Sequence, residues 1–309
     1  MSTRFTRLAV LAFLTVIPAV RVSPQEATLH QPHVRPRVDN RSLVDSVRDH
    51  DMVRVQKLLN SGVDPNARAN DGTTALSWAA WYGYTDVMKV LLAARADVNE
   101  KGPHGATALI SAAYGDHSDA VKLLLDAKAD VSAEQTDGTT ALIEAVVRTD
   151  PEMFQMLLDA GPDLTVDSHG HNTALMVAST LGHADQVRKL LAAGARPNDK
   201  NQDGDTALFL ALRCDLHSLT HSSGRCGPNI ETIQALLGFG ADVDASRTDG
   251  ATPLIIASEK DYPDAVRALI AGGASLNIRQ NDGDTALTAA SRLGHSDITA
   301  ILKAAEASH

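Results

Sequence analysis

The sequence predicts an all-α repeat solenoid of about eight stacked units, each made of a helix–turn–helix and a hairpin loop. The first observation behind this is a fixed period: a Thr-Ala-Leu or Thr-Pro-Leu triplet recurs every 33 residues, with one interval of 46 that contains 13 extra residues. The triplets begin at Thr74, Thr107, Thr140, Thr173, Thr206, Thr252 and Thr285. A period of this length is typical of supersecondary units that each contact mainly their neighbours.

The second observation is the constant order of residues at the start of each period. An Asp-Gly dipeptide, which favours a tight reversal, precedes most triplets. The triplet threonine is a suitable N-cap for a short helix because its hydroxyl can accept from an orphaned backbone N–H. The leucine and an alanine pair, as at Ala79-Ala80 and Ala112-Ala113, then give the helix a small-residue face that allows close packing.

The third observation is a second helix with equally regular signals. A carboxylate marks its first turn, where the helix dipole favours negative charge, at Asp86, Asp119, Glu152, Asp185, Glu231, Asp264 and Asp297. An apolar pair follows, from Leu91-Leu92 to Ile301-Leu302, and the helix ends at Gly161, Gly194, Gly240 or Gly273. Arg95 and Lys128 replace this glycine in two units, and each should cost about 1 kcal/mol if the left-handed conformation is kept.

Together these parts resemble the ankyrin repeat, with its hairpin tip, Thr-Pro-Leu-His helix, Leu-Leu helix and Gly-Ala-Asp-Val-Asn ending. Residues 124–131 and 240–244 show the ending, and Leu43 and Leu58-Leu59 mark a degenerate first unit. Two departures are that proline occurs in the triplet only at Pro253 and that histidine never follows it. The resemblance implies a repeat domain over 39–309, with units at 39–71, 72–104, 105–137, 138–170, 171–203, 204–249 (with the insertion), 250–282 and 283–309.

The N-terminal residues predict export. Arg4 and Arg7 precede an uncharged apolar stretch over 8–20, which is too short to span a bilayer comfortably but suits a signal peptide. We therefore expect a signal peptide over 1–23, a linker over 24–38, and a periplasmic or extracellular location, with an uncleaved N-terminal anchor as the alternative. The resemblance together with this signal indicates a bacterial protein.

The charge of the repeat region argues against nucleic-acid binding. The chain carries −10 in total, and residues 1–37 contribute five arginines against one glutamate, or +4, so residues 38–309 carry −14. Such a body repels phosphate backbones. Half of this charge has a structural reason, because seven carboxylates mark the second helices.

The resemblance implies that a partner protein binds the concave face formed by the hairpin tips and the ends of the first helices. Aromatic residues gather there in the N-terminal half: Trp78, Trp81, Tyr82, Tyr84 and Tyr114 are five of the six Trp and Tyr residues. These types suit interface anchors, and we expect Trp81, Tyr82 and Tyr114 to contact a partner. Trp78 and Tyr84 are expected to fill packing space instead.

Basic residues at other first-helix ends form a second candidate. They are Arg148, Arg213, Lys260 and Arg292. They would bind a short acidic segment of a partner, or they would simply be solvated helix termini favoured by the dipole.

The insertion in the sixth unit contains both cysteines, Cys214 and Cys226. In an exported protein a disulfide is the simplest expectation, worth roughly 3 kcal/mol for a loop of this size. Cys214, His217, His221 and Cys226 also supply four ligands that tetrahedral zinc would accept, and free thiols are a third possibility.

No enzyme signature is found. The sequence has no G-x-S-x-G elbow, H-E-x-x-H pair, phosphate-binding glycine-rich loop or dinucleotide fingerprint. We expect a monomeric, non-enzymatic interaction scaffold without a cofactor. The alternative is a metal- or redox-responsive accessory protein that acts through the insertion.

Overall fold

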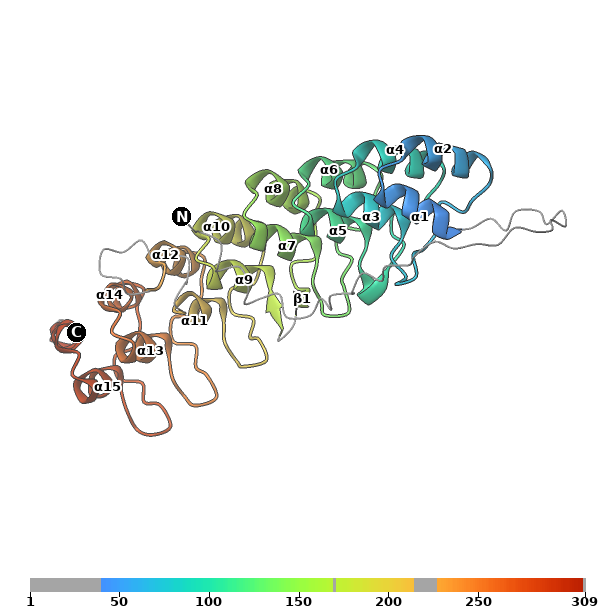
Figure 1. Ribbon diagram of the computed structural model, residues 1–309. Helices are drawn as coiled ribbons and strands as arrows, with labels where there is room; N and C mark the ends of the chain where they lie inside the picture. Colours follow the sequence, from blue (N-terminus) through green and yellow to red (C-terminus); the bar gives the residue numbers. More distant parts are fainter. Residues whose placement is uncertain (1–39, 169–170, 214–226, 308–309) are drawn as a thin grey trace, which may run out of the picture. The chain divides into compact units, whose positions relative to one another are not determined.

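The chain divides into two units, Met1–Arg37 and Val38–His309, and the residues described below belong to the second. The computed structural model describes residues 40–168, 171–213 and 227–307. First and second helices alternate along this part of the chain and lie in two rows (Figure 1). The predicted signal peptide and the whole of the predicted linker therefore lie outside the described residues. None of the described helices is both long and apolar enough to cross a bilayer.

The helices are short, mostly two turns each. The first helices are α1 (Asn40–Arg48), α3 (Ala75–Trp81), α5 (Ala108–Tyr114), α7 (Ala141–Arg148), α9 (Ala174–Thr180), α11 (Ala207–Ala211), α13 (Pro253–Glu259) and α15 (Ala286–Leu293). The second helices are α2 (Met52–Asn60), α4 (Thr85–Ala93), α6 (Ser118–Asp126), α8 (Pro151–Asp159), α10 (Ala184–Ala192), α12 (Ile230–Gly238), α14 (Pro263–Ala271) and α16 (Ser296–Glu306). Hairpin loops join each pair to the next, and they contain η1 (Pro103–Gly105), β1 (Asp167–Ser168) and β2 (Asn172–Thr173).

The predicted helix starts are confirmed with one exception. Six of the seven triplet threonines accept a hydrogen bond from the backbone N–H three residues later. Thr206 does not, and its buried hydroxyl has no partner among the described residues. The helix that it precedes, α11, has only five residues, and it ends in tight bonds from Leu212 to Phe209 and from Arg213 to Leu210. All seven predicted carboxylates lie in the first turn of a second helix.

The core is one continuous cluster that runs from Leu43 to Leu302. Its centre is the close contact of successive first helices, where the alanine pairs, such as Ala79-Ala80, are completely buried. In the apolar pairs from α4 to α14 the first leucine is fully buried and the second is less so, whereas in α2 both Leu58 and Leu59 are only partly buried. In the last unit Leu302 is the fully buried member and exposed Lys303 follows it, so the predicted pair Ile301-Leu302 was placed one residue too early.

The second helices end as predicted, with left-handed backbone at the glycine position. Arg95 and Lys128 both have φ of 67°, close to the 73° of Gly161 at the same position. A non-glycine residue is strained there by the contact of its Cβ with the backbone.

We predict that Arg95→Gly and Lys128→Gly each stabilise the protein by about 1 kcal/mol, because each removes a strained left-handed residue. A rise of the thermal midpoint would show this. The matched controls are Gly161→Ala and Gly194→Ala, where an added Cβ meets no atom within 4 Å. These controls should lower the midpoint through backbone strain alone. An unchanged midpoint in Arg95→Gly and Lys128→Gly would contradict the prediction.

A ladder of hydrogen bonds joins the ends of successive units. At one equivalent position in five units, a side-chain oxygen accepts a hydrogen bond from a backbone N–H of the next unit, with N···O distances of 2.7–2.9 Å. The acceptors are Asn66, Asn99, Ser132, Asn198 and Asp244. The bond from Asp242 to Asn198 spans the insertion, so the extra residues leave the ladder in place. At the equivalent Thr165 the hydroxyl instead donates to Asp163 of its own loop.

We predict that Asn99→Ala lowers the free energy of unfolding by about 1 kcal/mol, because the N–H of Asp130 loses its acceptor. Thr165→Ala is the matched control and should cost clearly less, since its hydroxyl bonds only within its own loop. Urea unfolding of both variants measures the difference. Equal costs would mean that the ladder does not couple the units.

Candidate functional site

Six rings from the first three helix pairs form one connected series, which we call the aromatic row. The members in order are His50, Tyr84, Tyr82, Trp78, Trp81 and Tyr114. Successive centroids are 4.0, 5.4, 5.7 and 6.0 Å apart along the first five rings, whose neighbouring planes lie within 17° of each other. Tyr114 meets Trp81 edge to face at 5.3 Å. These are favourable geometries for aromatic pairs.

The repeat explains how the row forms. Trp78 and Tyr82 are four residues apart at the end of α3, so they lie on one face of it. Tyr114 ends α5 at the position that Trp81 has in α3, and the two helices pack directly against each other. Equivalent positions of neighbouring units are therefore side by side, which a sequence with this period already implies.

Exposure divides the row into two parts. Trp78 and Tyr84 are partly buried and pack against the core, as expected for packing residues. Trp81 is 37% and Tyr82 is 43% exposed, which is unusual for large rings in this chain. Because Tyr82 stacks on both Trp78 and Tyr84, its ring is held in place before any partner arrives.

Arg148 extends the row by one side chain. Its guanidinium lies 4.4 Å from the centre of the Tyr114 ring, and its Nε is 3.8 Å from the carboxylate of Glu144. Burial raises the pKa of Glu144; Arg148 opposes this rise and Asp137 adds to it. The structure thus places Arg148 against Tyr114, one of the three predicted aromatic contacts, a proximity that the separate basic and aromatic sets did not anticipate.

The other basic residues do not form a free positive stripe. Arg213 bonds Asp205 at 2.9 Å, and Arg292 bonds Asp284 through two nitrogens at 2.9 and 2.7 Å. Lys260 is exposed at the end of α13. Both arginine side chains remain about half exposed, at 48% for Arg213 and 54% for Arg292, which agrees with solvated helix ends. Carboxylates of their own units nevertheless hold both guanidinium groups, so they are not free donors for an acidic partner.

A signal for these pairs is present in the sequence. In both units the aspartate directly precedes the triplet threonine and the arginine follows eight residues after it. Asp205 is only 2% exposed on its side chain and also meets Arg247, in the hairpin loop at the end of the same unit, at 2.7 Å. Asp284 has a lowered pKa because Arg292 and Thr288 donate to it.

The insertion residues Cys214, His217, His221 and Cys226 lie outside the described residues, so the disulfide and zinc alternatives stay predictions. Within the part of the chain that the structure describes, no three His, Cys, Asp or Glu side chains gather as metal ligands would.

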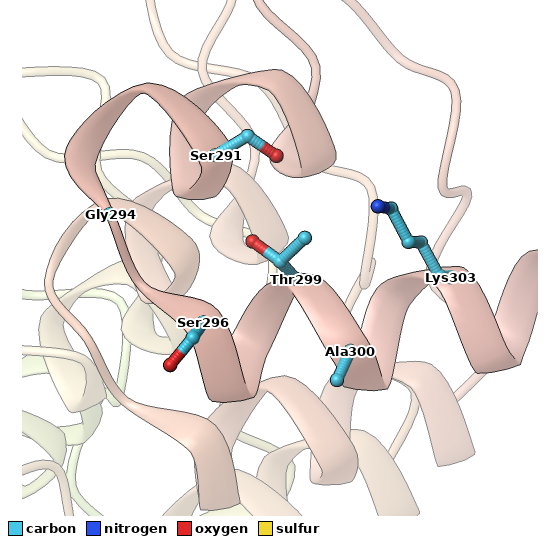
Figure 2. A pocket seen from close by; sticks show the side chains of 6 residues that line it. All are labelled: Ser291, Gly294, Ser296, Thr299, Ala300 and Lys303. Atoms are coloured by element: carbon cyan, nitrogen blue, oxygen red, sulfur yellow. The ribbon is translucent and has the colours of Figure 1, made fainter.

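A small open hollow lies between the last two helices (Figure 2). Its lining consists of Ser291, Gly294, Ser296, Thr299, Ala300 and Lys303. The lining comes from α15, α16 and the turn between them, in the last helix pair of the chain. The lining includes no carboxylate, histidine or cysteine side chain, so the hollow offers no acidic or metal-binding group.

We predict that Glu144→Gln makes the protein more stable relative to wild type as the pH rises from 4 to 7. The pKa of Glu144 in the folded state lies above its ordinary value of 4.5. Its contribution to stability is therefore complete below that value and is lost as the pH rises through the folded-state pKa. Urea unfolding of both proteins at several pH values measures this loss. Glutamine does not ionise, so the variant should not show it.

A second variant tests the cause. Arg148→Met removes the group that lowers the pKa of Glu144, so the decline of stability with pH should become steeper. In Glu144→Gln, a trend of the opposite sign would mean that the Arg148 ion pair outweighs the burial of Glu144. In Arg148→Met, an unchanged decline would mean that Arg148 does not influence the pKa of Glu144.

Comparison with known proteins agrees with this architecture. The family model described as ankyrin repeats (3 copies) matches residues 95–168 and 219–309, more than half of the chain. Models described as ankyrin repeats (many copies) and ankyrin repeat match 58–110 and 170–202. A search of curated proteins gives no match.

A solved structure shares the fold. The crystal structure of the human ASB11 ankyrin repeat domain has a TM-score of 0.58 and 24% sequence identity, over 75% of this chain and 98% of that one. At this identity the likeness concerns the fold alone. With period, caps, core and family models in agreement, the chain belongs to the ankyrin-repeat family.

Proposed function

We propose that this protein is a non-enzymatic scaffold that binds another protein through Trp81, Tyr82, Tyr114 and Arg148. Ankyrin-repeat domains generally mediate protein–protein interaction. The observation that carries the proposal is that the rings of Trp81 and Tyr82 are exposed and are already held in position by stacking on Trp78.

Two physical arguments support this surface. Large aromatic side chains and arginine dominate binding energy at interfaces because they bury much area on contact. A side chain that is already ordered loses little conformational entropy on binding, and the stacked rings meet that condition. Arg148, held between Tyr114 and Glu144, is ordered in the same way.

The wider organisation is part of the proposal. We propose that 39–309 forms eight ankyrin repeats, that 1–23 directs export, and that the protein acts as a monomer. Arg213 and Arg292 are assigned to holding their own hairpins rather than to the partner, because Asp205 and Asp284 occupy them.

We predict that Trp81→Ala with Tyr82→Ala weakens partner binding by more than tenfold, since anchors of this kind contribute about 2 kcal/mol or more each. Partners are captured with wild-type protein from an extract of the source organism, purified, and titrated against each variant. Phe239→Ala is the matched control, because Phe239 is an equally exposed ring (47%) that follows α12, away from the row. Urea unfolding verifies the fold of each variant. Partner binding that is equal in the double variant and in Phe239→Ala would refute the proposed surface.

A further inference from the structure

We propose that the partner segment that occupies Trp81 and Tyr82 is basic, with arginine or lysine side chains lying against the two rings. This inference rests on the proposed function and adds the chemistry of the partner. The basic residues at the first-helix ends suggested from the sequence that the partner segment is acidic; this inference gives the segment the opposite charge.

The first step concerns which charged side chains of the protein are free to bind a partner. An acidic partner would need free cationic groups, but three of the four predicted basic residues lie against carboxylates: Arg213 against Asp205, Arg292 against Asp284 and Arg148 against Glu144. The fourth, Lys260, is exposed at the end of α13. The body over 38–309 carries −14, so its long-range field attracts a basic segment and repels an acidic one.

The second step concerns the local balance beside the row. Arg148 is the cation at one end of the row, and the carboxylate of Glu144 lies beside it. Asp137 is close enough to raise the pKa of Glu144. Asp116, two residues after Tyr114, is exposed. At the other end of the row, Nε2 of His50 lies 3.1 Å from both carboxylate oxygens of Asp86. Glu144 and Asp86 thus lie near the two ends of the row, beside Arg148 and His50 respectively.

The third step is that the chain itself displays the proposed contact. The guanidinium of Arg148 lies over Tyr114 with Glu144 behind it, and Trp81 is the next ring along the row. In the part of the chain that the structure describes, cations lie over the rings of Tyr114, Phe154 and Phe209. Trp81 and Tyr82 carry no such cation, although Trp offers the strongest aromatic face for one.

The test uses a set of labelled Gly-Ser peptides that differ only in one residue type. One peptide carries several arginines; its matched partners carry lysine, the neutral isostere citrulline, or glutamate at the same positions. Binding is measured by fluorescence anisotropy and by the quenching of tryptophan fluorescence, at low and at physiological salt. We expect the arginine peptide to bind about tenfold or more tightly than the citrulline peptide, and the glutamate peptide not to bind.

The variants separate the rings from the general acidity of the body. Trp81→Leu with Tyr82→Leu keeps an apolar surface but removes the aromatic faces, so binding of the arginine peptide should fall about tenfold. Phe239→Ala should leave it unchanged. If the arginine peptide binds no better than citrulline, or if the leucine variant binds it equally well, the inference is wrong.

The natural partner, once captured, distinguishes this inference from the proposed function. A partner that needs Trp81 and Tyr82 through a neutral or acidic segment would leave the proposed function standing and overturn the basic segment. A partner that ignores both rings would overturn the proposed function itself. A ring-dependent partner whose binding is lost when its arginines and lysines are replaced by glutamine would support both.

Discussion

The structure depends on the burial of a small-residue face between successive first helices. One helix pair cannot cover that face by itself: α3, whose alanines are fully buried, contacts the first helices of both neighbouring units, α1 and α5. Alanine at these positions lets two backbones approach closely, and a larger side chain would separate the helices and disturb every contact that depends on their spacing. The hydrogen-bond ladder from Asn66 to Asp244 also depends on this spacing of the helices, because each of its bonds joins one unit to the next. Close packing of the first helices therefore determines the register of the whole stack.

This dependence explains which features the sequence could predict. The period, the threonine caps, the acidic first turns and the left-handed helix ends all follow from residues within one unit, and the structure confirms them with the exception of Thr206. The failure at Thr206 falls in α11, the shortest of the first helices, which leads directly into the insertion. A rule derived from regular units does not apply to a helix that is cut short.

The features of the site that the sequence did not predict are contacts between units. Residues at equivalent positions lie side by side, so the neighbourhood of Trp81 and Tyr114 followed from the period. The stacking of Tyr82 between Trp78 and Tyr84, and the position of Arg148 over Tyr114, depend on rotamers that no motif specifies. The ion pair of Arg213 with Asp205 was missed for a different reason. Arginine at a helix end was interpreted as a response to the dipole, when a carboxylate eight residues earlier was the nearer cause.

The acidity of the chain has two separable origins, and only one of them concerns a partner. The carboxylates that open the second helices are stabilised by the helix dipole, and two of them, Asp185 and Asp264, also pair with an arginine three residues later. That charge would be present in a repeat protein that bound nothing. Glu144 also lies in the first turn of its helix, α7, and pairs with Arg148 four residues later, but unlike those carboxylates it is largely buried and its pKa is raised. A carboxylate retained there at a cost to stability holds Arg148 against Tyr114 and adds negative charge beside the exposed rings. Under the proposed function, the carboxylates of the second helices serve stability, whereas Glu144 of a first helix serves recognition as well.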